Sequence, residues 1–155
     1  MRDRQQHQMS ERGFSLIELM IVIAIIGILV GVGVFGWKVA IRKGNEAAAI
    51  QTVSRIREAQ ASFALSHRGD YGTFDQLIKD GSLDEKFAGD SPVINGYIYV
   101  MKVTPKSTNQ PANFIINANP QQFGQTGSRY FYFDPALTTI RSNEDKEAGA
   151  TDPSI

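Results

Sequence analysis

Apolar residues are concentrated in one unbroken run near the N-terminus. Residues 19–37 contain no charged or strongly polar side chain. As a helix, this run would be about 28 Å long, which is roughly the hydrocarbon thickness of a bilayer. The pattern therefore predicts a membrane-spanning helix rather than a surface helix of a small soluble domain.

A cleavable secretory signal is the alternative interpretation of the same run. Such a signal needs a shorter apolar core that is followed by a small-x-small cleavage site. Residues 38–44 read Lys-Val-Ala-Ile-Arg-Lys-Gly, which is a poor site. We therefore favour a retained membrane helix and expect Arg42 and Lys43 to lie at the membrane interface.

The helical pattern continues after the run, but it becomes amphipathic. An apolar stripe recurs at spacings of three and four, formed by Ile50, Val53, Ile56, Gln60 and Phe63 and widened by Ala49, Ala59 and Ala64. The charged residues fall largely off this stripe, namely Arg42, Glu46, Arg55, Arg57 and Glu58. His67 and Gly69 supply a stop signal, because glycine takes the left-handed position that ends many helices. The sequence predicts one helix over residues 15–68. Its first half is apolar on all sides and its second half is amphipathic, so we expect the two halves to lie in different environments.

The rest of the chain predicts a short helix and a sheet. Thr73 and Gln76 fit a capping box that begins the helix, and Gly81 ends it. Aromatic and β-branched residues predict strands over residues 97–103, 113–118, 130–133 and 138–141. Proline and glycine between these strands favour turns, hence an antiparallel meander. The predicted fold class is α+β: a long N-terminal membrane-spanning helix packed on a C-terminal antiparallel sheet of about four strands.

Composition narrows the possible chemistry. Lys and Arg number 16 and are balanced by 16 Asp and Glu. A chain without a basic excess is not expected to bind nucleic acid generally, because phosphate contact needs such an excess. The absence of cysteine excludes disulfides, thiolate metal sites and cysteine nucleophiles. We expect no cofactor and no bound metal.

Two groups of polar residues are candidates for a catalytic or a metal site. Ser66, His67 and Asp70 are the residue types of a catalytic triad, but neighbours at one helix end cannot form the required chain of hydrogen bonds. Asp84, Glu85 and Asp90 offer carboxylates for calcium, but they lack the spacing of an EF-hand. We expect a helix-terminal charge at His67, a solvated turn at the acidic group, and no catalytic residue.

The residues directly before the apolar run carry the most specific signal. Residues 11–19 read Glu-Arg-Gly-Phe-Ser-Leu-Ile-Glu-Leu. This segment resembles the class III signal of type IV pilins and of the related pseudopilins of type II secretion. That signal has a short basic leader ending in glycine, then usually phenylalanine, and a glutamate four residues later. Gly13, Phe14 and Glu18 match these positions.

The resemblance implies processing by a prepilin peptidase between Gly13 and Phe14, on the cytoplasmic side, and methylation of the new Phe14 amine. Glu18 would then pair with the Phe14 amine of a neighbouring subunit and set the register of assembly. The expected organisation is a cleaved leader (1–13), a transmembrane and filament-core helix (14–41), an amphipathic half-helix (42–68), a globular domain (69–142) and a polar tail that frays (143–155).

On this resemblance, the mature chain is expected to be a structural subunit of a type IV pilus and not an enzyme. A pseudopilin of a type II secretion system is the alternative. Expected partners are other copies of the chain, the prepilin peptidase, the inner-membrane assembly machinery and, before assembly, membrane lipid. The precursor would cross the inner membrane once, with its leader in the cytoplasm and its globular domain in the periplasm, before joining an extracellular pilus or a periplasmic pseudopilus.

Simpler interpretations exist for parts of this signal. Ser15 and Glu18 also fit a helix capping box, which is compatible with a pilin. A membrane-anchored binding module would need the helix and the sheet, but it would not need a cut site at Gly13. Gly27 and Gly31 form a Gly-x-x-x-Gly pair, a spacing that lets membrane helices pack closely.

Overall fold

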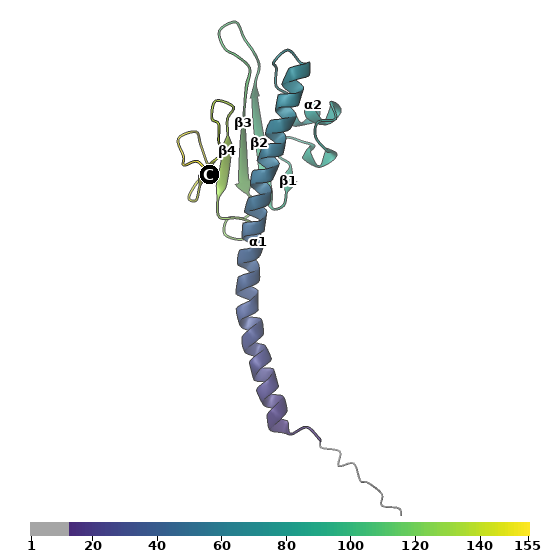
Figure 1. Cartoon of the computed structure of the whole chain (residues 1–155), viewed down its shortest axis with the longest axis vertical. Coiled ribbons are helices and arrows are strands. Elements are labelled where there is room, and N and C mark those ends of the chain that lie inside the picture. The colour runs from purple at the N-terminus through teal and green to yellow at the C-terminus, as the bar shows by residue number, and fades with distance from the viewer. Residues whose placement is uncertain (1–12) are drawn as a thin grey trace, which may run out of the picture. The chain divides into compact units, whose positions relative to one another are not determined.

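The computed structural model describes residues 13–155, except for the side chains of Val34 and Phe35. The chain divides into two compact units, Met1–Trp37 and Lys38–Ile155. Its helices are α1 (Leu16–Ser66), α2 (Phe74–Lys79) and the 3-10 helix η1 (Glu85–Phe87). Its strands are β1 (Val93–Ile94), β2 (Tyr97–Thr104), β3 (Asn113–Pro120), β4 (Tyr130–Phe133) and β5 (Arg141–Asn143), as labelled in part in Figure 1.

The part of α1 in the first unit is apolar on every side. Its described large apolar side chains are all exposed, from 47% at Val22 to 75% at Leu16. By length and composition, α1 is the one helix in the described part of the chain that can cross a membrane. Since the unit does not bury this surface itself, a lipid bilayer or another protein has to cover it.

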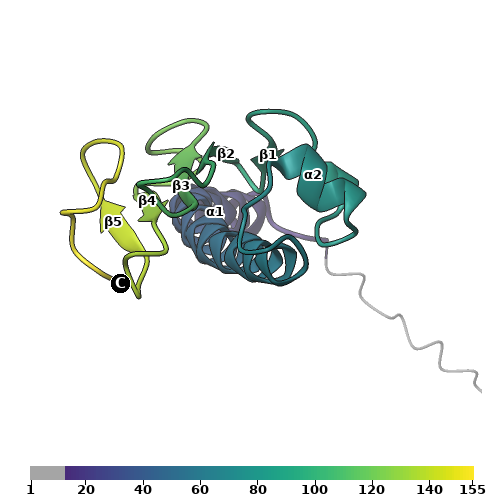
Figure 2. The same ribbon diagram turned by 90° about the horizontal axis from the view of Figure 1, so that it is seen from above.

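The part of α1 in the second unit lies along one face of the sheet (Figure 2). Its apolar stripe is confirmed, because Val53, Ile56 and Phe63 are buried in the core. Gln60 is also buried, and it satisfies the backbone of the following loop: its Nε2 donates to Gly72 O at 2.6 Å and its Oε1 accepts from Gly72 N at 3.0 Å. These bonds offset the cost of burying an amide.

The sheet is an antiparallel meander with the order β1-β2-β3-β4-β5, as the turn residues predicted. Tyr99 of β2 is paired with Ala118 of β3, and Ala118 is paired with Phe131 of β4. All three side chains are fully buried. Because alternate residues of a strand point to opposite faces, this register gives the sheet one continuous apolar face.

The predicted stop and start signals of the helices are confirmed, with small shifts in position. Helix α1 ends at Ser66, two residues before its expected end, and Arg68 and Gly69 take positive φ angles of 56° and 87°. The capping box of α2 is complete: Thr73 N donates to Gln76 Oε1 at 2.8 Å, and Gln76 N donates to Thr73 Oγ1 at 3.4 Å.

Three strands lie where the sequence predicts them, but the fourth does not. Residues 138–140 form no strand, because the turn from Asp134 to Leu137 is followed by a bend, and β5 begins only at Arg141. Strand β1 was not predicted, since it has only two residues. It is joined to β2 by a tight turn in which Asn95 and Gly96 both have positive φ angles, the turn geometry that an Asn-Gly pair favours.

The prediction that residues 143–155 fray is wrong. Ser142 N donates to Pro153 O at 2.9 Å, and Ile155 N donates to Ile140 O at 3.1 Å, so the chain end is bonded to β5 and the residue before it. Ala148 is buried, and its carbonyl accepts a bond from Asn117 of β3. The polar composition of this segment hid the backbone hydrogen bonds that order it.

We predict that a fragment of residues 38–155 folds without detergent, because the second unit buries its apolar stripe against its own sheet. Ile56→Ala should lower its free energy of unfolding by about 2–5 kcal/mol, the usual cost of deleting a buried side chain of this size. Leu65→Ala is the matched control, since Leu65 is 89% exposed. Circular dichroism with urea unfolding measures both, and an unfolded fragment would contradict this fold.

Candidate functional site

The junction before α1 presents an open peptide bond. Residues 13–15 are not helical, and α1 begins at Leu16. Phe14 is 90% exposed, and no atom lies within 4 Å of a Cβ placed on Gly13. A protease can therefore reach the Gly13–Phe14 bond without unfolding any of the described structure. The predicted leader, apart from Gly13, lies outside the described residues.

Glu18 lies in the first turn of α1, close to this junction. Its Oε2 accepts a hydrogen bond from the backbone N of Ser15 at 3.0 Å. This bond is one of the two that make a capping box, and it satisfies a backbone donor at the helix start. In the described part of the chain, the exposed Glu18 therefore acts as a local cap.

The glycines of the apolar run offer a bare surface. No atom outside the neighbouring helix backbone lies within 4 Å of a Cβ placed on Gly27, Gly31, Gly33 or Gly36. Another helix can come close to α1 at such positions, because no side chain holds the two backbones apart.

A second polar site, which the sequence analysis missed, lies in the Lys38–Ile155 unit. The Glu46 carboxylate of α1 is fully buried there. Its Oε1 accepts from Ser128 N at 3.0 Å and from Ser128 Oγ at 2.7 Å. Its Oε2 accepts from Arg129 Nε at 2.9 Å and from Lys43 Nζ at 3.2 Å. We call these four residues the Glu46 cluster.

The ionised form of Glu46 is strongly favoured. Burial by itself would raise the pKa of its carboxyl, but the hydrogen bonds from Ser128, Lys43 and Arg129 outweigh burial and lower that pKa to about 2. The expectation that Glu46 lies off the apolar stripe is wrong. Residues 46, 49, 53, 56, 60 and 63 follow the same spacings of three and four, so Glu46 begins the stripe.

Tyr97 extends this cluster into the sheet. Its hydroxyl donates to Arg129 O at 2.8 Å, and burial together with the negative charge of Glu46 raises the pKa of Tyr97. Gly127 packs so closely against Tyr97 that any Cβ there would overlap the phenol ring. The segment before β4 is thus held by both α1 and β2.

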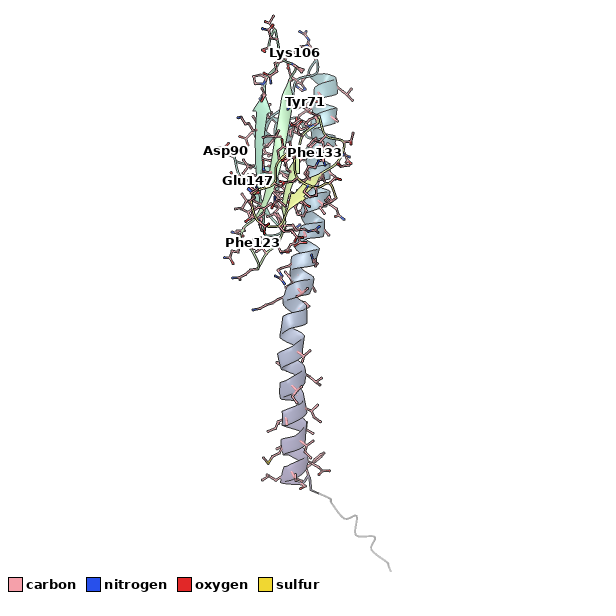
Figure 3. The ribbon with its side chains drawn as sticks, turned by 90° about the vertical axis from the view of Figure 1, so that its left-hand side faces the viewer. Tyr71, Asp90, Lys106, Phe123, Phe133 and Glu147 are labelled. Atoms are coloured by element: carbon pink, nitrogen blue, oxygen red, sulfur yellow. The ribbon has the colours of Figure 1, made fainter. Side chains whose placement is uncertain are left out.

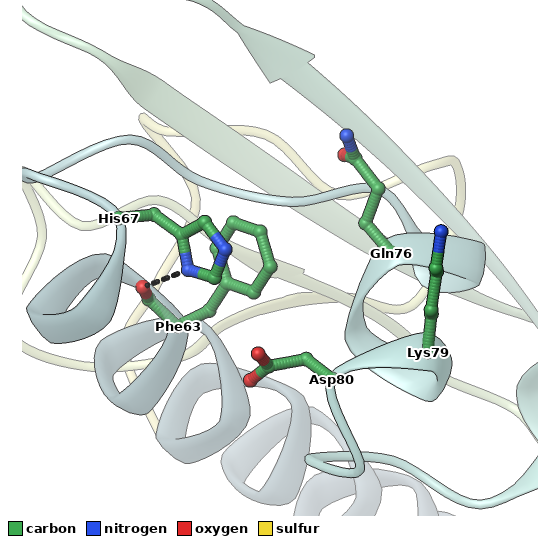
Figure 4. A pocket seen from close by; sticks show the side chains of 5 residues that line it. All are labelled: Phe63, His67, Gln76, Lys79 and Asp80. Atoms are coloured by element: carbon green, nitrogen blue, oxygen red, sulfur yellow. Dashed lines mark hydrogen bonds between the residues drawn. The ribbon is translucent and has the colours of Figure 1, made fainter.

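The residues weighed as a triad are not arranged as one. His67 stacks on Phe63 with ring centroids 3.7 Å apart, and its Nδ1 lies 3.0 Å from Phe63 O and 3.1 Å from Ser66 Oγ. Figure 4 shows the ring at the end of α1, where it lines an open pocket of about 400 Å³ with Gln76, Lys79 and Asp80. Both described polar contacts of the ring are made by Nδ1 with residues in the last turn of α1, which fits a role in ending that helix.

Of the carboxylates considered for calcium, Asp84 pairs with cationic side chains. Asp84 Oδ2 lies 2.8 Å from Arg55 Nη2 and 3.5 Å from Lys86 Nζ. Among the residues that the structure describes, no three His, Cys, Asp or Glu side chains gather as a metal site. The described contacts of Asp84 are with cationic side chains.

We predict that Glu46→Gln makes the stability of the 38–155 fragment less dependent on pH. The folded-state pKa of Glu46, about 2, lies below its usual value of 4.5. Its contribution is therefore fully present above about pH 5 and is lost as pH falls towards 2. At pH 7 the variant should be less stable by about 3 kcal/mol, and the difference should shrink towards pH 2. Urea unfolding across this range, with the exposed Glu58→Gln as control, measures it. A difference that does not change with pH would contradict the account.

Comparison with known proteins bears on the junction. Residues 8–34 match the family model of the prokaryotic N-terminal methylation motif. Neither the curated proteins nor the solved structures that were compared include a match to the chain. The matched segment contains Gly13, Phe14 and Glu18 and most of the apolar run. The motif is the class III prepilin-like signal of type IV pilins and pseudopilins, and it supports a precursor of this kind; the long apolar helix followed by an antiparallel sheet agrees with that layout.

Proposed function

We propose that the chain is a prepilin whose mature form, beginning at Phe14, is a structural subunit of a type IV pilus. The observation that carries this proposal is the junction: an exposed, non-helical Gly13–Phe14 bond followed directly by a helix whose apolar surface the chain leaves uncovered. The motif implies processing by a prepilin peptidase and assembly into filaments, and the apolar helix fits an inner-membrane anchor.

The uncovered half of α1 suits a subunit that changes its surroundings. Before assembly, lipid chains would cover its apolar side chains, and in a filament the helices of other copies would cover them. The hydrophobic effect favours both states over water. It discriminates poorly between them, since lipid tails are as apolar as leucine side chains. A polar group in the run can supply the specificity of assembly that apolar burial does not.

Glu18 is the polar group in the right place. It is the one charged residue between Phe14 and Trp37. In a filament core its carboxylate would be removed from water, which costs several kcal/mol unless a partner is present. Cleavage after Gly13 would create a new cationic partner, the Phe14 amine. Pairing of Glu18 with the Phe14 amine of a neighbouring copy would reject shifted registers, because a shift leaves both charges unpaired.

A pseudopilin of a type II secretion system is the alternative to a pilus subunit. It would use the same signal, the same peptidase and the same charge pair. The two assignments differ in where the filament ends, at the cell surface or within the periplasm. Electron microscopy of cells that express the chain with its native assembly machinery tests this choice, since surface filaments support the pilus and their absence supports the pseudopilus.

We predict that Gly13→Leu blocks processing. No atom lies within 4 Å of a Cβ at Gly13, so the substitution does not disturb the described fold, and its effect reports recognition by the peptidase. Immunoblots of membranes should show the uncut precursor accumulating at the expense of the mature form. Gly44→Ala is the control, because Gly44 has equally open surroundings but lies beyond the matched motif. Normal cutting of Gly13→Leu would contradict the proposed site.

We predict that Glu18→Ala is cut and inserted into the membrane but forms few or no filaments. If Glu18 were only a cap, its loss would cost about 1 kcal/mol of helix stability and leave assembly intact. Electron microscopy of the variant, expressed as the sole subunit, separates the two roles. Glu58→Ala controls for loss of an acidic residue on α1, since Glu58 is exposed and lies outside the apolar run. Abundant normal filaments from Glu18→Ala would rule out the register mechanism.

A further inference from the structure

The loop between β3 and β4 is fastened to the first turns of α1 in the Lys38–Ile155 unit. Arg42 Nη1 donates to Gly124 O at 3.0 Å, and Asn45 Nδ2 donates to Thr126 O at 2.9 Å. Within the loop, Gly124 N donates to Gly127 O at 2.8 Å. Two side chains of α1 thus fix the position of this loop along the helix.

The loop presents an aromatic ring to the outside. Phe123 is 54% exposed, although its ring stacks on Tyr130 with a centroid distance of 5.7 Å and an interplanar angle of 12°. Figure 3 places Phe123 at the end of the unit where α1 enters it, and places Lys106, in the β2–β3 loop, at the opposite end. A half-exposed ring with a rigid support is suited to a boundary between water and an apolar phase.

The surroundings of Phe123 are cationic. Residues 38–45 and 121–129 contain Lys38, Arg42, Lys43 and Arg129 and no Asp or Glu. The neighbouring carboxylate, Glu46, is buried and paired with Lys43 and Arg129, so the positive charge beside the loop comes mainly from Lys38 and Arg42. Lys38 and Ile41 of α1 and Gly124 and Gln125 of the loop line a recess of about 340 Å³. The surface therefore combines positive charge with an apolar ring, which complements an anionic lipid surface.

Chain connectivity sets the depth of this surface. Lys38 directly follows the apolar run of residues 19–37, whose end would lie at the bilayer interface. Arg42 is five residues beyond Trp37, at most about 8 Å further along the helix whatever its tilt. The headgroup region on each side of a bilayer is about 5–8 Å thick. A loop bonded to the Arg42 side chain is therefore tethered close to the headgroup region.

We propose that Phe123 and the recess beside it dock on anionic phospholipid headgroups of the bilayer that holds the apolar run. This docking rests on the membrane-anchored state of the proposed function, and it does not depend on the choice between pilus and pseudopilus. It would hold the sheet in one orientation on the membrane before assembly. Entry into a filament would then require this contact to break together with withdrawal of the helix.

The test uses the full precursor in vesicles that contain phosphatidylglycerol, phosphatidylcholine and a lipid with a nitroxide on its headgroup. Because the chain has no cysteine, Gln125→Cys and Lys106→Cys each give one labelling site for a fluorophore. Quenching at position 125 should exceed that at position 106 about threefold or more, and should fall when phosphatidylcholine replaces phosphatidylglycerol. Quenching of the single tryptophan, Trp37, reports independently that the apolar run is inserted.

Two further variants test whether the quenching at position 125 depends on the proposed residues. Adding Phe123→Ser or Lys38→Gln to the labelled Gln125→Cys chain should reduce quenching to the level at position 106. Equal quenching at positions 125 and 106, with Trp37 quenched, would overturn the docking while leaving the membrane anchor intact. The docking would also be overturned if quenching at position 125 appeared only in vesicles that hold several chains. That result would assign the surface to contact between copies.

Discussion

The Glu46 carboxylate lies between α1 and the segment before β4, and it remains ionised there because hydrogen bonds from Ser128, Arg129 and Lys43 outweigh the cost of burial. The backbone carbonyl of Arg129 in turn accepts a hydrogen bond from the hydroxyl of Tyr97 in β2. The buried charge thus connects the helix to the segment before β4, and that segment is in turn bonded to β2. An unpaired carboxylate at this position would be strongly unfavourable, so the cluster selects one position of the sheet along α1. The apolar stripe alone would tolerate small displacements, because hydrophobic contacts are not directional.

Two glutamates on the same helix show how the chain divides its interactions. Glu46 finds all its partners within its own chain, and it lies where α1 begins to pack on the sheet. Glu18 has one described hydrogen bond, from the Ser15 backbone, and is surrounded by apolar residues that the chain leaves exposed. The first carboxylate completes a folded unit. We propose that the second pairs with a neighbouring copy of the chain, which is why we place assembly specificity there.

Much of the fold could be predicted from local patterns. The apolar stripe, the Thr73 capping box and three of the strands are encoded by residues close together in the chain. The later start of β5 depends on the turn after Asp134. The last residues are ordered by backbone hydrogen bonds with Ile140 and Ser142, which composition does not reveal. For β1, the Asn95-Gly96 pair carried a usable signal.

The candidate site likewise has a part that the sequence predicts and a part that it does not. The Gly13–Phe14 junction and Glu18 are contiguous in the sequence, so the motif could be found there and the family comparison agrees with it. The role of Glu46 could not be predicted in full. Its place on the stripe follows from the spacing, but Ser128 lies 82 residues away, and only the folded chain brings the two together.

Cleavage after Gly13 would make the apolar helix the first element of the mature chain. The intact mass of the protein purified from membranes of its native host tests this cleavage. The account predicts a chain that begins at Phe14, lacks residues 1–13 and carries one additional methyl group on its terminal amine. A chain that retains Met1, or one that begins after Ala40 as a secretory signal would require, would contradict it.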